Sequence, residues 1–365
     1  MANAKRGEIA GQQLILLKDE APEPRLAASR VQEEGGRVLH VYGSRVLIEQ
    51  TPRSGADVED AIVEEATENL SETERLGLAA WNARQTEEFE SAKELRPLEG
   101  DAWDLHEPPD APETVHGEIA ADESAELLSP TRDLSAFLIG SVAVGLILVE
   151  GPTPDLQFSE SEITKVVAEV QEGLTWLAQQ EPRANVTWSY DIRTVRVSAM
   201  PDSGLSGFEP LERVWRDPAM QQLGFSASFQ GVRDYVASLR ARLGTDWGYA
   251  GFFTKYPLHH FAYASKPRVV MSFGNGEWGP DNIDRVFTHE TGHLFGCPDE
   301  YSASNCDCNQ RFGFLQERNG NCRSCATPFV PCLMEAHTSA LCSFTRTHLG
   351  WRDSNGSGTF DPLDA

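Results

Sequence analysis

The amino-acid sequence predicts an α+β protein with a small N-terminal domain and a larger C-terminal one. Short apolar runs bounded by Gly, Pro and Asn, which are typical of strands, alternate with segments of helical spacing. Two helical segments open with a Ser-x-x-Glu capping box, at Ser71 and at Ser159. A stretch rich in Pro, Asp and Glu separates the two halves. We therefore expect a small domain at residues 1–70, a helix and acidic linker at 71–133, a main domain at 134–353 and a frayed tail at 354–365.

The first 70 residues show the order strand, helix, strand, strand, helix, or βαββα. The strands are expected at residues 12–18, 37–41 and 45–49, and the helices at 22–34 and 58–70. Gly35 and Gly36 end the first helix, because glycine adopts the left-handed conformation that commonly terminates a helix. The pattern indicates a compact α+β unit.

The segment from residue 71 to residue 133 begins as a helix and continues as a linker. The capping box at Ser71 opens a helix that we expect to reach about residue 95. Residues 97–130 contain few aliphatic side chains, so they cannot bury enough apolar surface to order themselves. Residues 51–133 hold 23 Asp and Glu against 6 Lys and Arg, which concentrates the acidic charge of the chain here.

The main domain is predicted as strand, helix, strand, helix, three strands and a further helix, with a short helix near its C-terminal end. The strands are expected at residues 137–148, 185–197, 248–254, 260–264 and 269–273. The helices are expected at residues 160–180 and 226–243, from about residue 281 onward, and at 341–351. From residue 354 the chain is polar and rich in Gly, so we expect it to fray.

Composition excludes several classes of function. The formal net charge of −25 disfavours nucleic acid and anionic membrane surfaces, because both attract Lys and Arg. The longest apolar stretch, residues 136–149, is too short to span a bilayer as a helix and is better interpreted as a buried strand. Residues 1–13 are polar and show no secretory signal, so we expect a cytoplasmic location or export by a signal-independent route.

The main functional signal lies at residues 289–301, which read HETGHLFGCPDEY. His289 and His293 are four residues apart on a helix, so both imidazoles can reach one metal ion with Glu290 beside them. Catalytic zinc commonly has three protein ligands and a water whose pKa falls to about 7 on the metal. Glu290 would accept the proton of that water and pass it to the leaving amine.

The chain after this helix is expected to turn back toward the metal. Gly296 can end the helix cheaply in a left-handed conformation, and Pro298 prevents the helix from resuming. Asp299 follows His293 by six residues, the position of the last histidine in the zinc signature HExxHxxGxxH. Glu300 is the competing third ligand.

With these residues the chain resembles the metzincin metallopeptidases, and Asp in the third ligand position is closest to the snapalysin-type branch. The resemblance implies zinc on His289, His293 and Asp299, with Glu290 as general base. It also implies a methionine turn at Met334 beneath the metal, a mixed twisted sheet, an active-site helix and a small C-terminal subdomain.

The same resemblance suggests where a substrate binds. The segment around Phe261, Ala262 and Tyr263 falls where the family places its edge strand, along which an extended peptide lies antiparallel. His259 and His260 are assigned to this strand or its turn, and not to the metal. We likewise do not count His348 as a ligand.

The small N-terminal domain resembles, by element order alone, the ferredoxin-like prodomains that help peptidases fold or inhibit them. The resemblance implies that residues 1–70 either assist folding of the peptidase or inhibit it within the same chain. An accessory domain of another purpose is the alternative.

All seven cysteines lie between Cys297 and Cys342, which indicates a local role in this region and not a disulfide framework for the whole chain. Four of them form two close pairs separated by 13 residues: Cys306 with Cys308, and Cys322 with Cys325. The spacing suits a second, structural zinc ion held by four thiolates. Disulfides are the rival interpretation, and a redox-active Cys-x-x-Cys is a third.

Together these observations predict a zinc-dependent endopeptidase that acts on protein or peptide substrates. Two alternatives stay open. The domain could keep its metal and serve as a binding or docking module without proteolytic activity. It could also be a latent effector protease specific to one protein.

Overall fold

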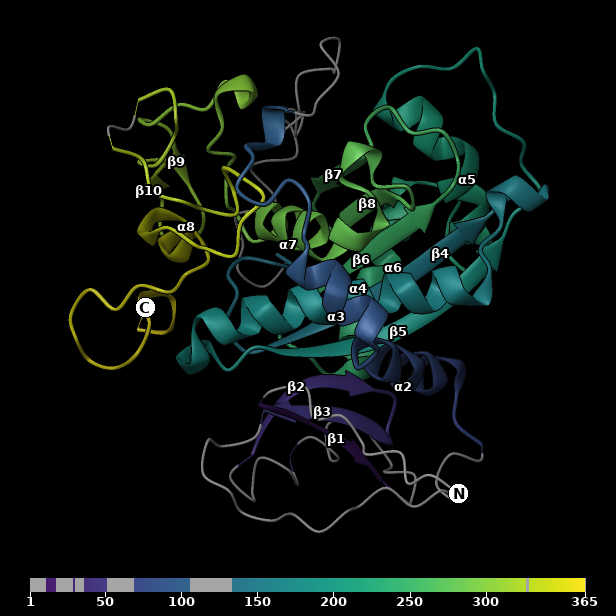
Figure 1. Ribbon diagram of the computed structural model, residues 1–365, viewed down its shortest axis with the longest axis horizontal. Coiled ribbons are helices and arrows are strands. Elements are labelled where there is room, and N and C mark those ends of the chain that lie inside the picture. Colours follow the sequence, from purple (N-terminus) through teal and green to yellow (C-terminus); the bar gives the residue numbers. More distant parts are fainter. Residues whose placement is uncertain are drawn as a thin grey trace.

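A computed structural model describes residues 11–17, 29, 36–50, 69–105, 133–325 and 328–364. The helices expected at residues 22–34 and 58–70 lie outside the described residues, apart from residue 29 and residues 69–70, of which the last two are not helical. Most of the linker, from residue 106 to residue 132, also lies outside them. Within the described part, the chain is a mixture of helices and strands around a mixed sheet, as an α+β fold requires (Figure 1).

Eight strands form one sheet in the order β1-β3-β2-β5-β4-β6-β8-β7. The first pairings, β1 with β3 and β3 with β2, are antiparallel; the next four are parallel, and β8 with β7 is antiparallel again. The strands are β1 (Gln12–Leu16), β2 (Arg37–Tyr42), β3 (Val46–Gln50), β4 (Ser141–Glu150), β5 (Thr187–Arg196), β6 (Trp247–Thr254), β7 (Ala262–Ser265) and β8 (Arg268–Ser272).

A separate domain at residues 1–70 would have a sheet of its own. The described N-terminal strands instead join the main sheet. β2 pairs in parallel with β5, with His40 opposite Trp188 and Tyr42 opposite Tyr190. The rings of Tyr42 and Tyr190 stack with their centroids 4.5 Å apart. The described N-terminal strands are therefore a continuation of the main sheet.

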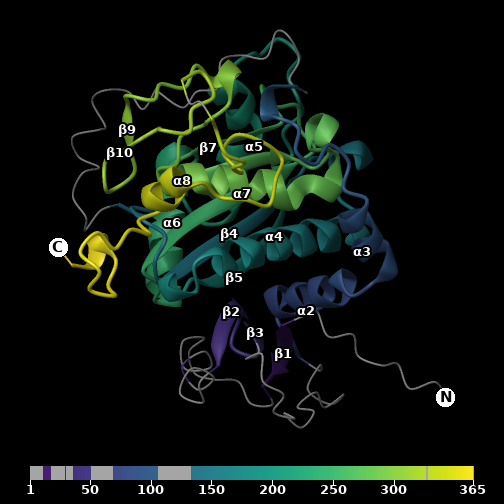
Figure 2. The ribbon, with the colours of Figure 1, turned by 60° about the vertical axis from the view of Figure 1, so that its left-hand side comes forward.

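Helices cover both faces of this sheet. Alternate residues of the central strand β4 point to opposite faces: Val144 and Leu146 pack with one core cluster, Ala143 and Ile147 with the other. The first cluster contains residues of the helices α2 (Glu72–Arg84), α4 (Glu160–Gln180) and α7 (Ile283–Leu294). The second contains residues of α5 (Phe208–Gln222) and α6 (Phe229–Leu243). Figure 2 shows α4 and α7 side by side in front of the sheet.

The α-helices are α2 (Glu72–Arg84), α3 (Glu87–Glu94), α4 (Glu160–Gln180), α5 (Phe208–Gln222), α6 (Phe229–Leu243), α7 (Ile283–Leu294) and α8 (Ser343–His348). Short 3-10 turns are η2 (Trp103–Leu105), η3 (Pro154–Leu156), η4 (Pro182–Ala184), η5 (Gly276–Trp278), η6 (Pro280–Asn282), η7 (Ser302–Ser304) and η8 (Asp361–Leu363). No described helix is long and apolar enough to cross a membrane.

Three further parts of the described chain differ from the sequence expectations. The helix expected over residues 71–95 is two helices, because Gln85 leaves the helical conformation and the Thr86 side chain accepts from the amide of Phe89 to begin α3. α5 was not expected at all. The tail is packed and not frayed: Phe360 is buried, and Arg352 forms an ion pair with Asp361 at 2.6 Å.

The helix that contains the histidine motif, α7, packs closely against α4. At Gly173 of α4, an added Cβ would lie 2.3 Å from the backbone oxygen of Asp284. Only a residue without a side chain allows this approach. α7 is thereby fixed against the face of the sheet, with its C-terminal end directed to the residues after 295 (Figures 1 and 2).

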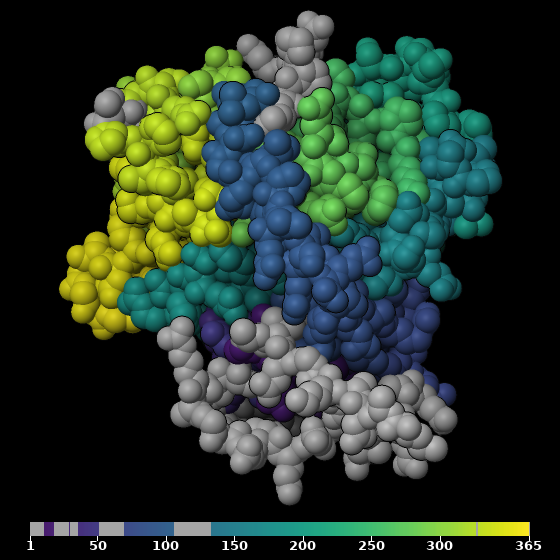
Figure 3. Space-filling model, viewed as in Figure 1, coloured from purple at the N-terminus to yellow at the C-terminus, as the bar shows by residue number. Residues whose placement is uncertain are grey.

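The residues after α7 form a separate region that contains a two-stranded sheet, β9 (Arg311–Phe312) with β10 (Glu317–Arg318), and helix α8. In the space-filling view these residues, coloured yellow, lie on the opposite side of the molecule from α5 (Figure 3). Residues around 85–105, coloured blue, pass between them and the green residues of the main domain.

Candidate metal centre

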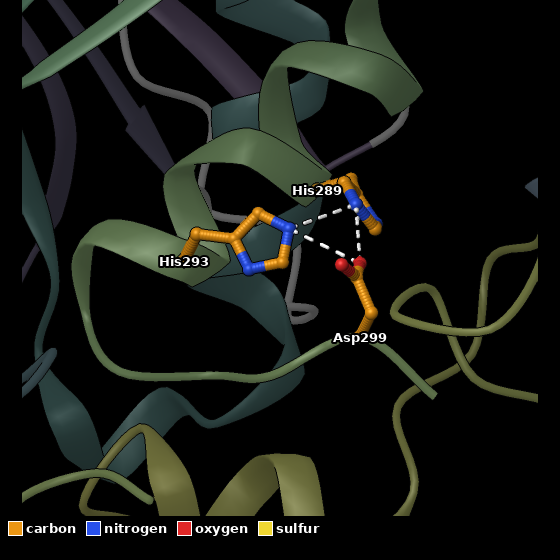
Figure 4. Close-up of side chains that lie close together, drawn as sticks. All are labelled: His289, His293 and Asp299. Carbon is orange, nitrogen blue, oxygen red and sulfur yellow. Dashed lines mark hydrogen bonds and ion pairs between the residues drawn. The ribbon is translucent and has the colours of Figure 1, made fainter. Parts of the chain in front are cut away.

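Three side chains converge at the end of α7. The Nε2 atoms of His289 and His293 are 3.0 Å apart, and each lies 3.2 Å from Oδ1 of Asp299. Figure 4 shows both rings and the carboxylate pointing toward one another, the histidines from the helix and Asp299 from the loop that follows. All three are at least nine-tenths buried as side chains. The described residues contain this group of His, His and Asp as a candidate metal site.

The other ring nitrogen of each histidine is held by a backbone carbonyl. Nδ1 of His289 lies 3.0 Å from the oxygen of Leu333, and Nδ1 of His293 lies 2.7 Å from the oxygen of Cys297. A carbonyl can only accept, so each Nδ1 carries the proton and each Nε2 presents its lone pair. This is the tautomer that a metal ligand needs, and such second contacts orient the ring.

Asp299 reaches the histidines because the helix stops abruptly. Gly296 has φ +90°, and a Cβ at that residue would lie 2.7 Å from the backbone of Gly313. The amide of Cys297 donates to the oxygen of Gly292 at 3.0 Å, which closes the turn. The predicted role of Gly296 as the helix terminator fits this geometry.

Glu290 is buried on the same helix, between the two histidines in sequence. Its Oε2 is buried without a hydrogen-bond partner among the described residues. A buried carboxylate oxygen left without a donor is uncommon and costly, so it points to a site that binds something else. A proton donor such as a water would satisfy it.

The pKa of His289 reflects the charges of the group. Burial lowers the pKa of this imidazole, but the hydrogen bond and charge of Asp299 outweigh burial, and the pKa lies above its usual value. Protons therefore compete with a metal ion for the same nitrogen.

Met334, the residue of the expected methionine turn, lies against α7. A Cβ on Gly292, the residue before His293, would meet Sδ of Met334 at 3.0 Å. The Met334 side chain is fully buried, and its backbone oxygen accepts from the amide of Glu300 at 2.9 Å. The loop holding Met334 is thus tied to the residue beside Asp299.

Glu300, the competing third ligand, faces a different cluster. Its oxygens accept from the Asn321 amide at 2.7 Å, the Thr345 hydroxyl at 2.8 Å and the Cys342 thiol at 3.1 Å. The carboxylate is satisfied by neutral donors, with Cys332 also close by. The geometry favours Asp299 as the third ligand.

Four of the seven cysteines are paired as disulfides, Cys306 with Cys322 and Cys308 with Cys325. The structure thus has the disulfide alternative in place of a structural zinc site on these four residues. The remaining cysteines, Cys297, Cys332 and Cys342, are buried thiols. Burial raises the pKa of Cys297 and Cys332, which keeps them protonated near neutrality.

The predicted edge strand is the outermost strand of the sheet at that end, β7. Ala262 and Tyr263 belong to it, and Phe261 precedes it with its oxygen accepting from the amide of Ser272 at 2.7 Å. The next carbonyl, that of Ala262, points to the open edge and contacts Nδ1 of His260 at 2.6 Å. His260 therefore belongs to the edge and not to the metal group, as expected.

His259 and His348 also lie apart from the metal group. His259 packs edge-on against Phe208. His348 of α8 is buried and contacts the oxygen of Glu317. Burial lowers the pKa of His348 to about 4.

Sequence reasoning missed one side chain of the site. Trp103, assigned to the linker, is buried against the His289 ring, with the ring centroids 5.0 Å apart. Trp278 and His337 pack against the same indole. A tryptophan inside an acidic stretch was itself a signal, because segments that stay disordered contain few aromatic residues.

No protein-family model matches this chain, and no curated protein matches it in sequence.

Proposed function

We propose that the chain is a zinc-dependent endopeptidase of the metzincin type. The observation that supports this best is the convergence of His289, His293 and Asp299 beside Glu290, with Met334 beneath the same helix. A buried triangle of two imidazoles and one carboxylate is a typical ligand set of a catalytic zinc ion.

The residues fit zinc in three respects. The donor atoms are nitrogen and oxygen, both ring tautomers present Nε2, and three protein ligands leave a fourth position open. When bound, zinc would acidify a water molecule and polarise the carbonyl of the bond to be cleaved.

The chain's own residues supply the proton transfer and the binding. Glu290 is the general base, because its partnerless Oε2 can accept a proton from water and return it to the leaving amine. The open edge of β7 offers backbone groups to an extended peptide, although the Ala262 carbonyl already contacts His260. A bound peptide would have to displace that ring or pair beyond it.

The test combines metal content with hydrolysis. Elemental analysis of full-length protein purified without added metal should give one zinc per chain, which falls to none in the double variant His289→Ala, His293→Ala. Glu290→Gln should keep the zinc and lose about three orders of magnitude in the rate of casein hydrolysis, because it removes proton transfer without removing a ligand. Zinc present with no hydrolysis by the wild type would instead favour the docking module. Undiminished hydrolysis by Glu290→Gln would refute the assigned mechanism.

A further inference from the structure

The backbone oxygen of Leu333 accepts two hydrogen bonds at the metal centre. One comes from Nδ1 of His289 at 3.0 Å and the other from the indole Nε1 of Trp103 at 2.6 Å. A carbonyl oxygen has two lone pairs, so it can accept both at once. The same carbonyl thus connects a predicted metal ligand to a side chain far earlier in the sequence.

The indole also covers the ring of His289. Trp103 is 5 % exposed, and its ring plane is tilted 57° to that of the histidine. Trp278 contacts the indole edge-on at 4.8 Å, and His337 at 5.7 Å. Trp103 therefore has little freedom to move, and it limits rotation of the imidazole.

The segment that contains Trp103, residues 96–105, is held at its start and again at its middle. Arg96 forms two hydrogen bonds to the carboxylate of Asp284, at 2.9 and 2.8 Å, near the start of α7. Further along, the amide of Gly100 donates to the oxygen of His337 at 2.7 Å, and the amide of His337 donates to the oxygen of Asp101 at 2.9 Å.

Backbone pairing between residues 100–102 and the loop after Met334 continues at the next residue of the segment. Ala102 forms a β-bridge with Ala336. The segment connects the first turn of α7 to the loop that orients His289. Figure 3 shows it crossing between the two halves of the molecule.

We propose that Trp103 is a positioning residue for the metal ligand His289. This inference rests on the proposed zinc site. The indole N–H fixes the direction of the Leu333 carbonyl, and that carbonyl fixes the orientation and tautomer of His289. The ring contact prevents the imidazole from turning away when no metal is bound. Residues 96–105 then belong to the metal centre and are not a connector.

The experiment compares two tryptophans in the full-length protein. Trp351 makes the same kind of bond as Trp103: its Nε1 donates to the oxygen of Leu138 at 2.6 Å, and it is 6 % exposed. Trp103→Phe and Trp351→Phe each keep an aromatic ring and remove one buried indole hydrogen bond. Zinc affinity is measured by competition with a chromophoric chelator, and thermal unfolding of the metal-free protein is measured in parallel.

Trp103→Phe should weaken zinc binding by about ten- to a hundred-fold, which is the usual effect of losing an outer contact to a ligand. Trp351→Phe should leave zinc affinity unchanged, although both substitutions lower the unfolding temperature of the metal-free protein. Equal zinc affinity in wild type and Trp103→Phe would overturn the inference and leave Trp103 a structural residue.

A second variant separates a binding effect from a folding defect. Trp103→Ala removes the ring contact as well, so its zinc affinity should be lower than that of Trp103→Phe at a temperature where circular dichroism shows both folded. Equal zinc affinities of Trp103→Phe and Trp103→Ala would refute the role assigned to the contact between the Trp103 and His289 rings. If the wild type binds no zinc, the proposed function itself is refuted. If the wild type binds zinc and Trp103→Phe binds it equally well, only the role of Trp103 is refuted.

Discussion

At the scale of single residues, the adjacent carboxylates Asp299 and Glu300 have different environments. The Asp299 carboxylate lies 3.2 Å from both histidine Nε2 atoms. The Glu300 carboxylate accepts from Thr345, Asn321 and Cys342. We expect Asp299→Ala to weaken zinc binding strongly, because one of three ligands is lost. Glu300→Gln should retain zinc, because its amide oxygen can still accept hydrogen bonds.

The measurement is zinc affinity for both variants, with the unfolding temperature of the metal-free proteins as a control. Glu300→Gln should lower that temperature, since its amide nitrogen cannot accept from the donors now bound to a carboxylate oxygen. The opposite pattern, zinc lost in Glu300→Gln and kept in Asp299→Ala, would mean that the third ligand is Glu300.

The residues of the metal group could be predicted because their relation is local. His289 and His293 are one helical turn apart, and Gly296 with Pro298 determines where the chain turns. The Leu333 carbonyl and Trp103 could not be predicted. A backbone oxygen leaves no trace in the residue type, and Trp103 is close to His289 only because residues far apart in sequence fold together.

At the scale of elements, α3, α4 and α7 meet in a buried group of charges. Glu169 of α4 accepts from Lys93 at 2.5 Å and lies 3.5 Å from Lys165. Asp284 of α7 faces the same lysine, Lys93, at 3.3 Å and is paired with Arg96. Burial and the neighbouring Asp284 charge raise the pKa of Glu169 to about 8, despite Lys93. The pKa of Asp284 is lowered, because Lys93 and Arg96 outweigh its burial.

These shifts predict how stability depends on pH. Between about pH 5 and 8 the folded protein keeps a proton on Glu169 that the unfolded chain has lost, so the free energy of unfolding falls as the pH rises through this window. The lowered pKa of Asp284 has the opposite effect on the free energy of unfolding. Its contribution to stability is lost only in acid, as the pH falls below the pKa of the unfolded carboxyl group. The pKa of Lys165 is raised, so that lysine stays charged throughout the window.

The check is the unfolding temperature at several pH values for the wild type and for Glu169→Gln. The amide is neutral at every pH, so the variant should lose less stability than the wild type between about pH 6 and 8. Identical pH profiles for the two proteins would mean that Glu169 is already ionised in the folded state.

Most helices and strands of the main domain could be predicted because their signals are local. The capping box at Ser159 is formed as expected, with its side chain accepting from the amide of Glu162. α5 was missed since Pro218 lies inside it and Gly207 precedes it, which are signals of a break. Its buried Trp215 packs against Phe252 of β6, so tertiary contacts sustain a helix that local propensity disfavours.

At the scale of the whole molecule, the N-terminal strands belong to the main sheet. β2 and β5 pair in parallel although about 150 residues separate them. No local pattern can specify such a pairing, and this is why the sequence suggested a separate domain. Contacts between α4 and β2 stabilise this pairing. Gln171 donates to the hydroxyl of Tyr42, and the Thr175 hydroxyl lies 2.7 Å from the His40 ring.

This arrangement predicts the behaviour of a chain that begins at residue 134. If residues 1–133 were a removable inhibitor, the shortened chain would fold and cleave casein faster than the full-length protein. The structure leads to the opposite expectation. Truncation removes β2 from the edge of β5 and uncovers Tyr190, and it also removes the Trp103 contact to His289. Each large apolar side chain whose burial is lost costs about 1.5–3 kcal/mol. Several such losses equal the whole stability of a typical domain, about 5–15 kcal/mol.

We therefore expect the shortened chain to aggregate, or to stay soluble with little bound zinc and exposed apolar surface. Size-exclusion chromatography, dye binding and zinc content, each against the full-length protein, distinguish these states. A monomeric shortened chain with one zinc and raised casein hydrolysis would contradict this expectation and establish residues 1–133 as an inhibitor. An unfolded shortened chain would instead mean that the N-terminal strands and the segment with Trp103 are parts of one folding unit with the main domain, because β2, β3 and β1 continue the sheet that supports α7.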